Sequence, residues 1–99
     1  MKVMISSLHF KADVKLENFV HEKVTKVSNL FDGVISSDVI LKLDQSSRND
    51  NKIAEIRINI PGNDLFAKKQ AKSFEEAVDS AVDALKKQIK RHKEKVKGL

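Results

Sequence analysis

The sequence predicts an α+β fold in the order β-α-β-β-β-α, with a four-stranded mixed sheet and two helices on one face. Apolar residues recur every three or four positions in two long segments, which indicates two amphipathic helices. Apolar and polar residues alternate in four short segments, as in strands with one buried face. A chain of 99 residues has room for one such core, so we expect a single domain over residues 1–99.

The first strand and the first helix occupy the N-terminal third of the chain. Val3 and Ile5 alternate with Lys2, Met4 and Ser6, which predicts a strand over residues 2–6. Asp13 is a suitable N-cap for the helix that follows. We expect this helix to end at Asp32-Gly33, because glycine readily adopts the left-handed conformation of a helix cap. Its apolar stripe comprises Val14, Leu16, Phe19, Val20, Val24, Val27, Leu30 and Phe31.

Three further strands are expected between the helices. They span residues 39–44, 54–60 and 65–71, with a polar hairpin loop over 45–52 and a turn over 61–64. Because a helix separates the first two strands, these should be parallel neighbours, while the last three form an antiparallel meander. Lys68 and Lys69 suit an edge strand that must not pair with other chains.

The second helix is predicted over residues 73–99, with the last few residues frayed. Ser73 and Glu76 have the spacing of a capping box, which satisfies free backbone donors at a helix start. One face of the sheet can cover this helix and the first one. The apolar stripe comprises Phe74, Ala77, Val78, Ala81, Val82, Leu85, Ile89 and Val96.

Positive charge is concentrated at the C-terminal end of this helix. Residues 86–99 contain seven Lys or Arg residues and one acid, whereas residues 1–85 contain twelve Lys or Arg residues and thirteen acids. Lys87, Arg91 and Lys95 are four residues apart and form a cationic row on one helix face. A near-neutral body with one cationic segment favours a polyanionic partner. The alternative is a solvated helix end that is basic only because cations suit the helix dipole, although one or two would suffice.

Composition argues against several functional classes. With no cysteine, the chain can form neither a disulfide nor a zinc-thiolate site, and His9, His21 and His92 lack metal-ligand spacing. We therefore expect no metal and no cofactor. Asp79 and Asp83 suit pairing with lysines better than catalysis, so the protein is not expected to be an enzyme. No apolar run approaches the roughly 20 residues of a membrane span, which favours a cytoplasmic protein. The absence of Trp and Tyr argues against binding by base stacking.

The element order and the last helix resemble the ribosome hibernation factors, which include short hibernation promoting factor and ribosome-associated inhibitor A. The helix reads A-V-D-x-x-V-D-x-L-x-x-Q-I-x-R-H-K-x-K from Ala77 to Lys95. In the first helix, Phe19-Val20 with Lys23, Lys26 and Phe31-Asp32 also resembles the family. The matching residues of the last helix are Ala77, Val78, Asp79, Asp83, Leu85, Gln88, Ile89, His92, Lys93 and Lys95.

The resemblance implies a fold like that of a double-stranded RNA-binding domain with an added first strand. It also implies binding to the small ribosomal subunit and its rRNA, in the channel that holds mRNA and tRNA. Occupation of that channel would block translation in stationary phase or starvation, and we expect a monomer off the ribosome. By position, the implied RNA contacts are Lys23, Lys26, Lys87, Arg91, His92, Lys93 and Lys95. Charge and proximity add Lys86, Lys90 and Lys97.

Two positions depart from the family pattern. Ala84 stands where a lysine is common, and Glu17 stands where a basic residue is common. Lys86 or Lys90 could supply the missing charge from a neighbouring helix position. The length is that of the short promoting type. The alternative function is a basic protein-interaction module that binds an acidic protein partner, because a basic amphipathic helix also suits such a target.

Overall fold

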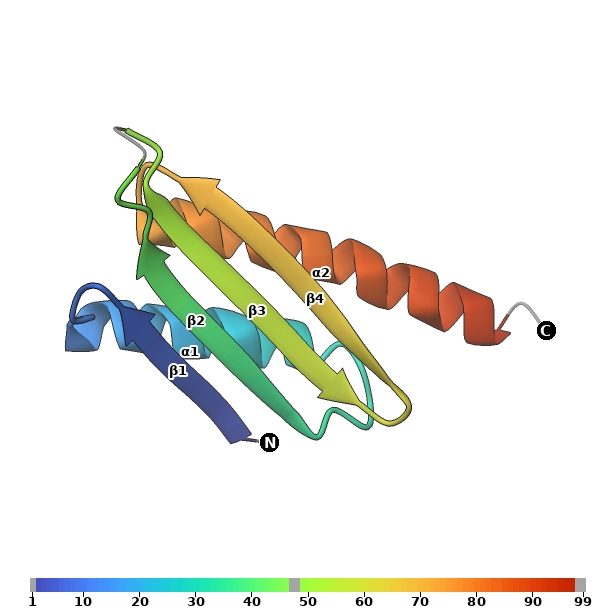
Figure 1. Cartoon of the computed structure of the whole chain (residues 1–99). Helices are drawn as coiled ribbons and strands as arrows, with labels where there is room; N and C mark the ends of the chain where they lie inside the picture. Colours follow the sequence, from blue (N-terminus) through green and yellow to red (C-terminus); the bar gives the residue numbers. More distant parts are fainter. Residues whose placement is uncertain (1, 47–48, 98–99) are drawn as a thin grey trace.

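The computed structural model describes residues 2–46 and 49–97, with the burial of side chains up to Lys93. Figure 1 shows one layer of four strands with both helices behind it, which confirms the predicted fold class. In chain order the elements are β1 (Lys2–Leu8), α1 (Val14–Ser28), β2 (Ser36–Leu43), β3 (Lys52–Ile60), β4 (Asn63–Ala71) and α2 (Phe74–Lys97).

The sheet has the strand order β1-β2-β3-β4, so β1 and β4 are its edges. β1 is parallel to β2, whereas β3 is antiparallel to both β2 and β4, as predicted. Val39 pairs with Ile56, and Ile56 pairs with Ala67. These three residues are buried. Successive side chains along a strand point to opposite faces of the sheet, so every second side chain faces the helices. The core therefore lies between the sheet and the two helices.

α1 starts where the sequence predicts and ends earlier. The Asp13 carboxylate caps it by accepting a 2.8 Å hydrogen bond from the Leu16 amide. The helix stops at Ser28, and Gly33 takes its positive φ of 95° in the following loop, so the predicted glycine cap is wrong. The buried hydroxyls of Ser28 and Ser37 lie 3.1 Å apart and tie this helix end to β2. This contact joins two elements that are distant in the sequence, so helical periodicity alone cannot reveal it.

The apolar stripe of α1 is shorter than predicted. Val14 is 70% exposed and Leu30 is 44% exposed, so neither belongs to the core. Val14 is the first residue of α1, and Leu30 follows the helix end, where the chain no longer keeps helical spacing. The apolar residues between them that are buried are Leu16, Val20, Val24 and Val27.

α2 begins at the predicted capping box, where the Ser73 hydroxyl accepts a 3.1 Å hydrogen bond from the Glu76 amide. In Figure 1 this helix runs behind β3 and β4 and projects past the β3–β4 turn. The predicted fraying and the side chain of Val96 lie outside the described residues. The buried stripe is confirmed for Phe74, Ala77, Val78, Ala81, Val82, Leu85 and Ile89.

Strands β2 and β4 extend beyond their predicted starts. β2 begins at Ser36, and its residue Ser37 is fully buried opposite Ile58. β4 begins at Asn63, which leaves only Pro61-Gly62 as the connection, with Gly62 at a φ of 78°. Polar residues at these strand ends are typical of turns, which is why the alternation rule places both starts too late.

Candidate nucleic-acid interface

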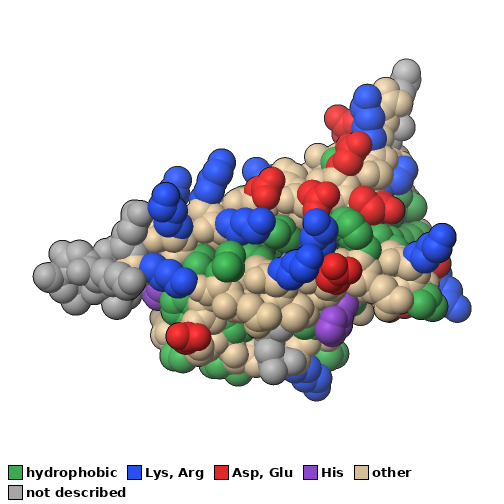
Figure 2. Space-filling model, turned by 180° about the vertical axis from the view of Figure 1, so that it is seen from behind, with side chains coloured by type: hydrophobic (Ala, Val, Ile, Leu, Met, Phe, Trp, Pro, Cys, Tyr) green, Lys and Arg blue, Asp and Glu red, His purple; other side chains and the backbone are tan. Residues whose placement is uncertain are grey.

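The exposed cations of α2 lie on the helical face of the molecule. Figure 2 shows Lys and Arg side chains gathered at the left of the view, next to the C-terminal end of α2. Most acidic side chains lie farther from this end. None of these α2 cations forms an ion pair with another residue that the structure describes. The exposed cations of α2 with described side chains are Lys86, Lys87, Lys90, Arg91 and Lys93.

One groove of about 440 Å³ separates α1 from α2. The Lys23 ammonium lies 3.3 Å from the Asp79 carboxylate across this groove. The Lys26 ammonium lies 3.3 Å from the Glu22 carboxylate on its own helix. Such exposed pairs contribute at most about 1 kcal/mol each, so an anionic ligand can displace them. The groove is lined by Lys23, Lys26, Asp79, Val82, Asp83 and Lys86.

A second groove of about 440 Å³ lies on the other side of α2, next to edge strand β4. The Gln88 amide nitrogen donates a 2.7 Å hydrogen bond to the Phe66 carbonyl, and its oxygen accepts one of 3.2 Å from the Phe66 amide. These two bonds connect α2 to the backbone of β4. They also satisfy the amide and the carbonyl of Phe66 at the open edge of the sheet. The groove is lined by Lys69, Ser80, Asp83, Ala84, Lys87, Gln88 and Arg91.

The structure divides the sequence-predicted contacts between these grooves. Lys23, Lys26 and Lys86 line the α1–α2 groove, whereas Lys87 and Arg91 line the β4–α2 groove. The two sets can therefore meet an RNA ligand from opposite sides of one helix.

Three further candidate residues with described side chains lie outside both linings. Lys90 and Lys93 are exposed on α2. His92 is only partly exposed, and its ring packs edge-on against Phe31 with the ring centroids 5.1 Å apart. This contact gives His92 a packing role at the end of the core. The side chains of Lys95 and Lys97 lie outside the described residues.

Sequence reasoning missed Lys69 as a member of the site. It lies two residues after the buried Ala67 and pairs with the buried Ala54, so it belongs to the helical face of β4. The alternation of side chains along a strand could have indicated this, because it places Lys69 on the same face as Ala67 and Lys68 on the opposite face. Lys86 lines a different groove from Ala84, and the suggestion that Lys86 or Lys90 supplies the missing charge stays a prediction. Lys69 is the added cation beside Ala84, and Glu17 remains exposed on α1.

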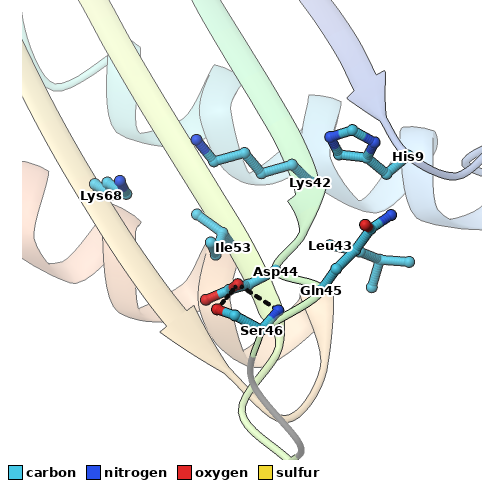
Figure 3. Close-up of a pocket in the computed structure, with 8 residues that line it drawn as sticks. All are labelled: His9, Lys42, Leu43, Asp44, Gln45, Ser46, Ile53 and Lys68. Atoms are coloured by element: carbon cyan, nitrogen blue, oxygen red, sulfur yellow. Dashed lines mark hydrogen bonds between the residues drawn. The ribbon is translucent and has the colours of Figure 1, made fainter.

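A third hollow, of about 360 Å³, lies on the sheet face that carries no helix. Figure 3 shows Lys42 and Lys68 at this hollow, with Asp44 and Ser46 joined by hydrogen bonds in the β2–β3 loop. The Lys42 ammonium lies 2.7 Å from the Glu55 carboxylate. Because acids balance the lysines here, this hollow is less suited to a polyanion than the grooves beside α2.

The Asp44 carboxylate in this hollow has a lowered pKa. The Ser46 hydroxyl, at 2.6 Å, and then the Ser46 amide, at 3.0 Å, hold the pKa of Asp44 below its ordinary value. Burial opposes these two bonds in part, and the Gln70 amide and the charge of Lys42 lower the pKa of Asp44 by still smaller amounts. Hydrogen bonds to a carboxylate favour its ionised form, which explains the direction.

Replacing Ser46 with alanine is expected to raise the pKa of Asp44 toward the ordinary value near 3.9. A carboxylate with a lowered folded pKa stabilises the protein above its unfolded pKa, and this contribution is lost as pH falls through the folded pKa. The variant should therefore lose less stability than the parent as the pH falls below about 4 and through the folded pKa of Asp44. Carbon-detected NMR titration of the Asp44 carboxyl checks this, and an unchanged pKa would contradict the assignment.

Over residues 2–46 and 49–97, no group of three or more His, Asp or Glu side chains is placed to hold a metal ion. No helix in the same part of the chain has the length and apolar character needed to cross a membrane.

The sequence of this chain is similar to one family model and to named bacterial proteins. A family model described as Sigma 54 modulation protein / S30EA ribosomal protein matches residues 3–97. The ribosome hibernation promoting factor of Pseudomonas putida is 31% identical over 99 residues, covering 100% of this chain and 93% of that protein. The protein of the same name from Klebsiella oxytoca is 24% identical over 97 residues and covers 98% of both chains.

Solved structures of similar shape agree with this fold. A ribosomal subunit interface protein from Coxiella burnetii has a TM-score of 0.83 at 16% identity, covering 94% of this chain and 98% of that one. The N-terminal domain of Protein Y from Thermus thermophilus has a TM-score of 0.78 at 24% identity, covering 93% and 99% respectively. At these identities the likeness shows a common fold and nothing more.

Proposed function

This chain belongs to the Sigma 54 modulation protein / S30EA ribosomal protein family, and from that premise we propose that it acts as a ribosome hibernation factor. In this proposal it binds the small ribosomal subunit in the mRNA and tRNA channel and blocks translation sterically in stationary or starved cells. The observation that carries the proposal is the set of exposed, unpaired cations along the described part of α2. The name of the Pseudomonas putida relative supports the same role.

The expected chemistry of binding is neutralisation of RNA phosphates. Each Lys or Arg that pairs with a phosphate releases condensed cations, so the affinity should fall steeply as salt rises. A rigid helix presents its cations at fixed spacing, which suits a folded RNA cleft of matching shape better than reading of base sequence. Arg91 can contact a phosphate with two parallel hydrogen bonds, which lysine cannot.

The proposed inhibition needs no covalent chemistry. A helical rod on a sheet platform fills space that mRNA and tRNA would need, so competition alone prevents translation. The protein would act in the cytoplasm, with rRNA of the small subunit as the principal contact. Among the candidate contacts, the cations of α2 are expected to dominate, because Lys23 and Lys26 already have acidic partners.

A sucrose-gradient profile of stationary-phase cells, with the protein detected by antibody, tests this function. We expect the protein in ribosomal fractions, and binding to purified small subunits should weaken roughly 100-fold or more between 50 and 200 mM salt. The proposal would be contradicted if the protein were found only in the soluble fractions. It would also be contradicted if its affinity for small subunits did not change with salt concentration. Nuclease-resistant pelleting with one acidic protein in the absence of ribosomes would instead support the protein-interaction alternative.

A further inference from the structure

We propose that the β4–α2 groove holds one backbone phosphate of folded RNA, with Lys69 acting beside Lys87 and Arg91 as its third cation. The inference rests on the proposed function for the source of the RNA, and adds to it a site and a strand residue. Lys69 comes from β4, whereas Lys87 and Arg91 come from α2. The site therefore exists only where the edge strand and the helix lie side by side.

The charge of the groove favours an anion. Its lining has three cations and one acid, Asp83. Among the described residues, no ion pair neutralises Lys69, Lys87 or Arg91. All three side chains are exposed, so their mutual repulsion is partly screened by water and salt in the free protein. A phosphate between them would relieve this repulsion, and it would gain charge-assisted hydrogen bonds.

The α1–α2 groove is less favourable for the same ligand. It also has three cations, but two acids line it, and Lys23 is already paired with Asp79 at 3.3 Å. Binding a phosphate there requires that this pair be broken first. The β4–α2 groove has no such requirement among its described residues, which is why we assign the phosphate to it.

The shape of the β4–α2 groove is fixed before binding. Both hydrogen bonds of Gln88 to the Phe66 backbone hold α2 at a set distance from β4. Ala84 and Ser80 have short side chains, so the floor between the cations stays open. Because the backbone is already in place, only the ends of three long side chains must be ordered on binding, which keeps the entropic cost low.

The adjacent lysine of β4 offers a matched control. Lys68 is exposed like Lys69, but it pairs with Glu55 in the sheet register and lines the hollow on the opposite face. A Lys→Gln change at either position removes the same charge from the same strand. Any difference between the two variants in RNA binding therefore reports the groove and not the net charge of the protein.

The test compares Lys69→Gln, Lys68→Gln and Lys69→Arg for binding to purified bacterial small ribosomal subunits at several salt concentrations. We expect Lys69→Gln to weaken binding about 5- to 10-fold and to lower the log–log salt slope by roughly 1, as for one lost phosphate contact. Lys68→Gln should stay within about 2-fold of the parent, and Lys69→Arg should retain the slope. Equal thermal midpoints in circular dichroism would show that all three variants are folded.

The possible outcomes separate this inference from the proposed function. If the parent protein binds small subunits but Lys69→Gln and Lys68→Gln behave alike, the groove assignment is wrong and the function stands. If Lys69→Arg loses as much binding as Lys69→Gln, the charge at this position is not what matters, and the assignment is also wrong. If the parent protein does not bind small subunits at all, both the function and the inference fail.

Discussion

Replacing Lys86, Lys87 and Arg91 together with glutamate should abolish co-sedimentation with small ribosomal subunits at moderate salt. Lys86 lines one groove, and Lys87 and Arg91 line the other, so the variant alters both proposed RNA contacts. If each lost contact costs about 1 kcal/mol, the three together weaken binding by roughly 100-fold, and the introduced repulsion adds to this. The fold should persist, because all three side chains are exposed and unpaired in the described part of the chain.

A control variant with the same change of charge reverses Lys11, Lys68 and Lys72. These side chains are exposed, and they lie in β4 or in segments that flank the start of a helix, away from the basic half of α2. We expect this control to retain most of the binding, with a small loss from the altered net charge. Equal losses in both variants would mean that the protein binds ribosomes through its overall charge, and the surface on α2 would then have no special role.

The parts of the fold that sequence reasoning predicts well depend on local rules. The cap formed by Asp13 and the one formed by Ser73 each join residues three positions apart, and both occur as predicted. The buried stripe of α2 follows helical periodicity over its described side chains. Such features need no knowledge of the rest of the chain, because the interacting groups are within one turn of each other.

The features that sequence reasoning misses depend on contacts between distant segments. The end of α1 is joined to β2 by the buried hydroxyl pair of Ser28 and Ser37. The spacing of His92 from Ile89 indicates packing, but not its partner Phe31, which is far from it in the sequence. The β4–α2 groove requires that Lys69 and Arg91 be neighbours in space, which the order of elements does not reveal. The predicted cationic row on α2 is therefore part of a surface that also includes a strand.

The two halves of α2 have different tasks. Its N-terminal half carries acidic residues in the first turn and shares the buried stripe that holds the helix on the sheet. Its C-terminal half carries the cations and projects past the β3–β4 turn (Figure 1). Cations near a helix C-terminus are favoured by the helix dipole, so the basic half stabilises the helix in addition to its proposed role in RNA binding. The apolar anchor must therefore extend far enough along α2 to fix the basic half.

Leu85 is the side chain on which this anchoring depends most directly. It is 0% exposed, and it lies between Ala84 of the β4–α2 groove and Lys86 of the α1–α2 groove. Replacing Leu85 with alanine should lower the free energy of unfolding by about 2.7–5 kcal/mol, from lost burial and the cavity left behind. For a domain of this size, the thermal midpoint should then fall by roughly 10–30 °C.

Leu30→Ala provides the matched control for this prediction, because it makes the same chemical change at a side chain that is 44% exposed. Its effect should stay below about 1 kcal/mol, since less apolar surface leaves water there on folding. Thermal unfolding followed by circular dichroism measures both variants. Similar midpoints for the two would mean that α2 does not pack on the sheet at Leu85. The basic half of the helix would then lack the fixed position that binding to a shaped RNA cleft requires, even with every lysine and arginine retained.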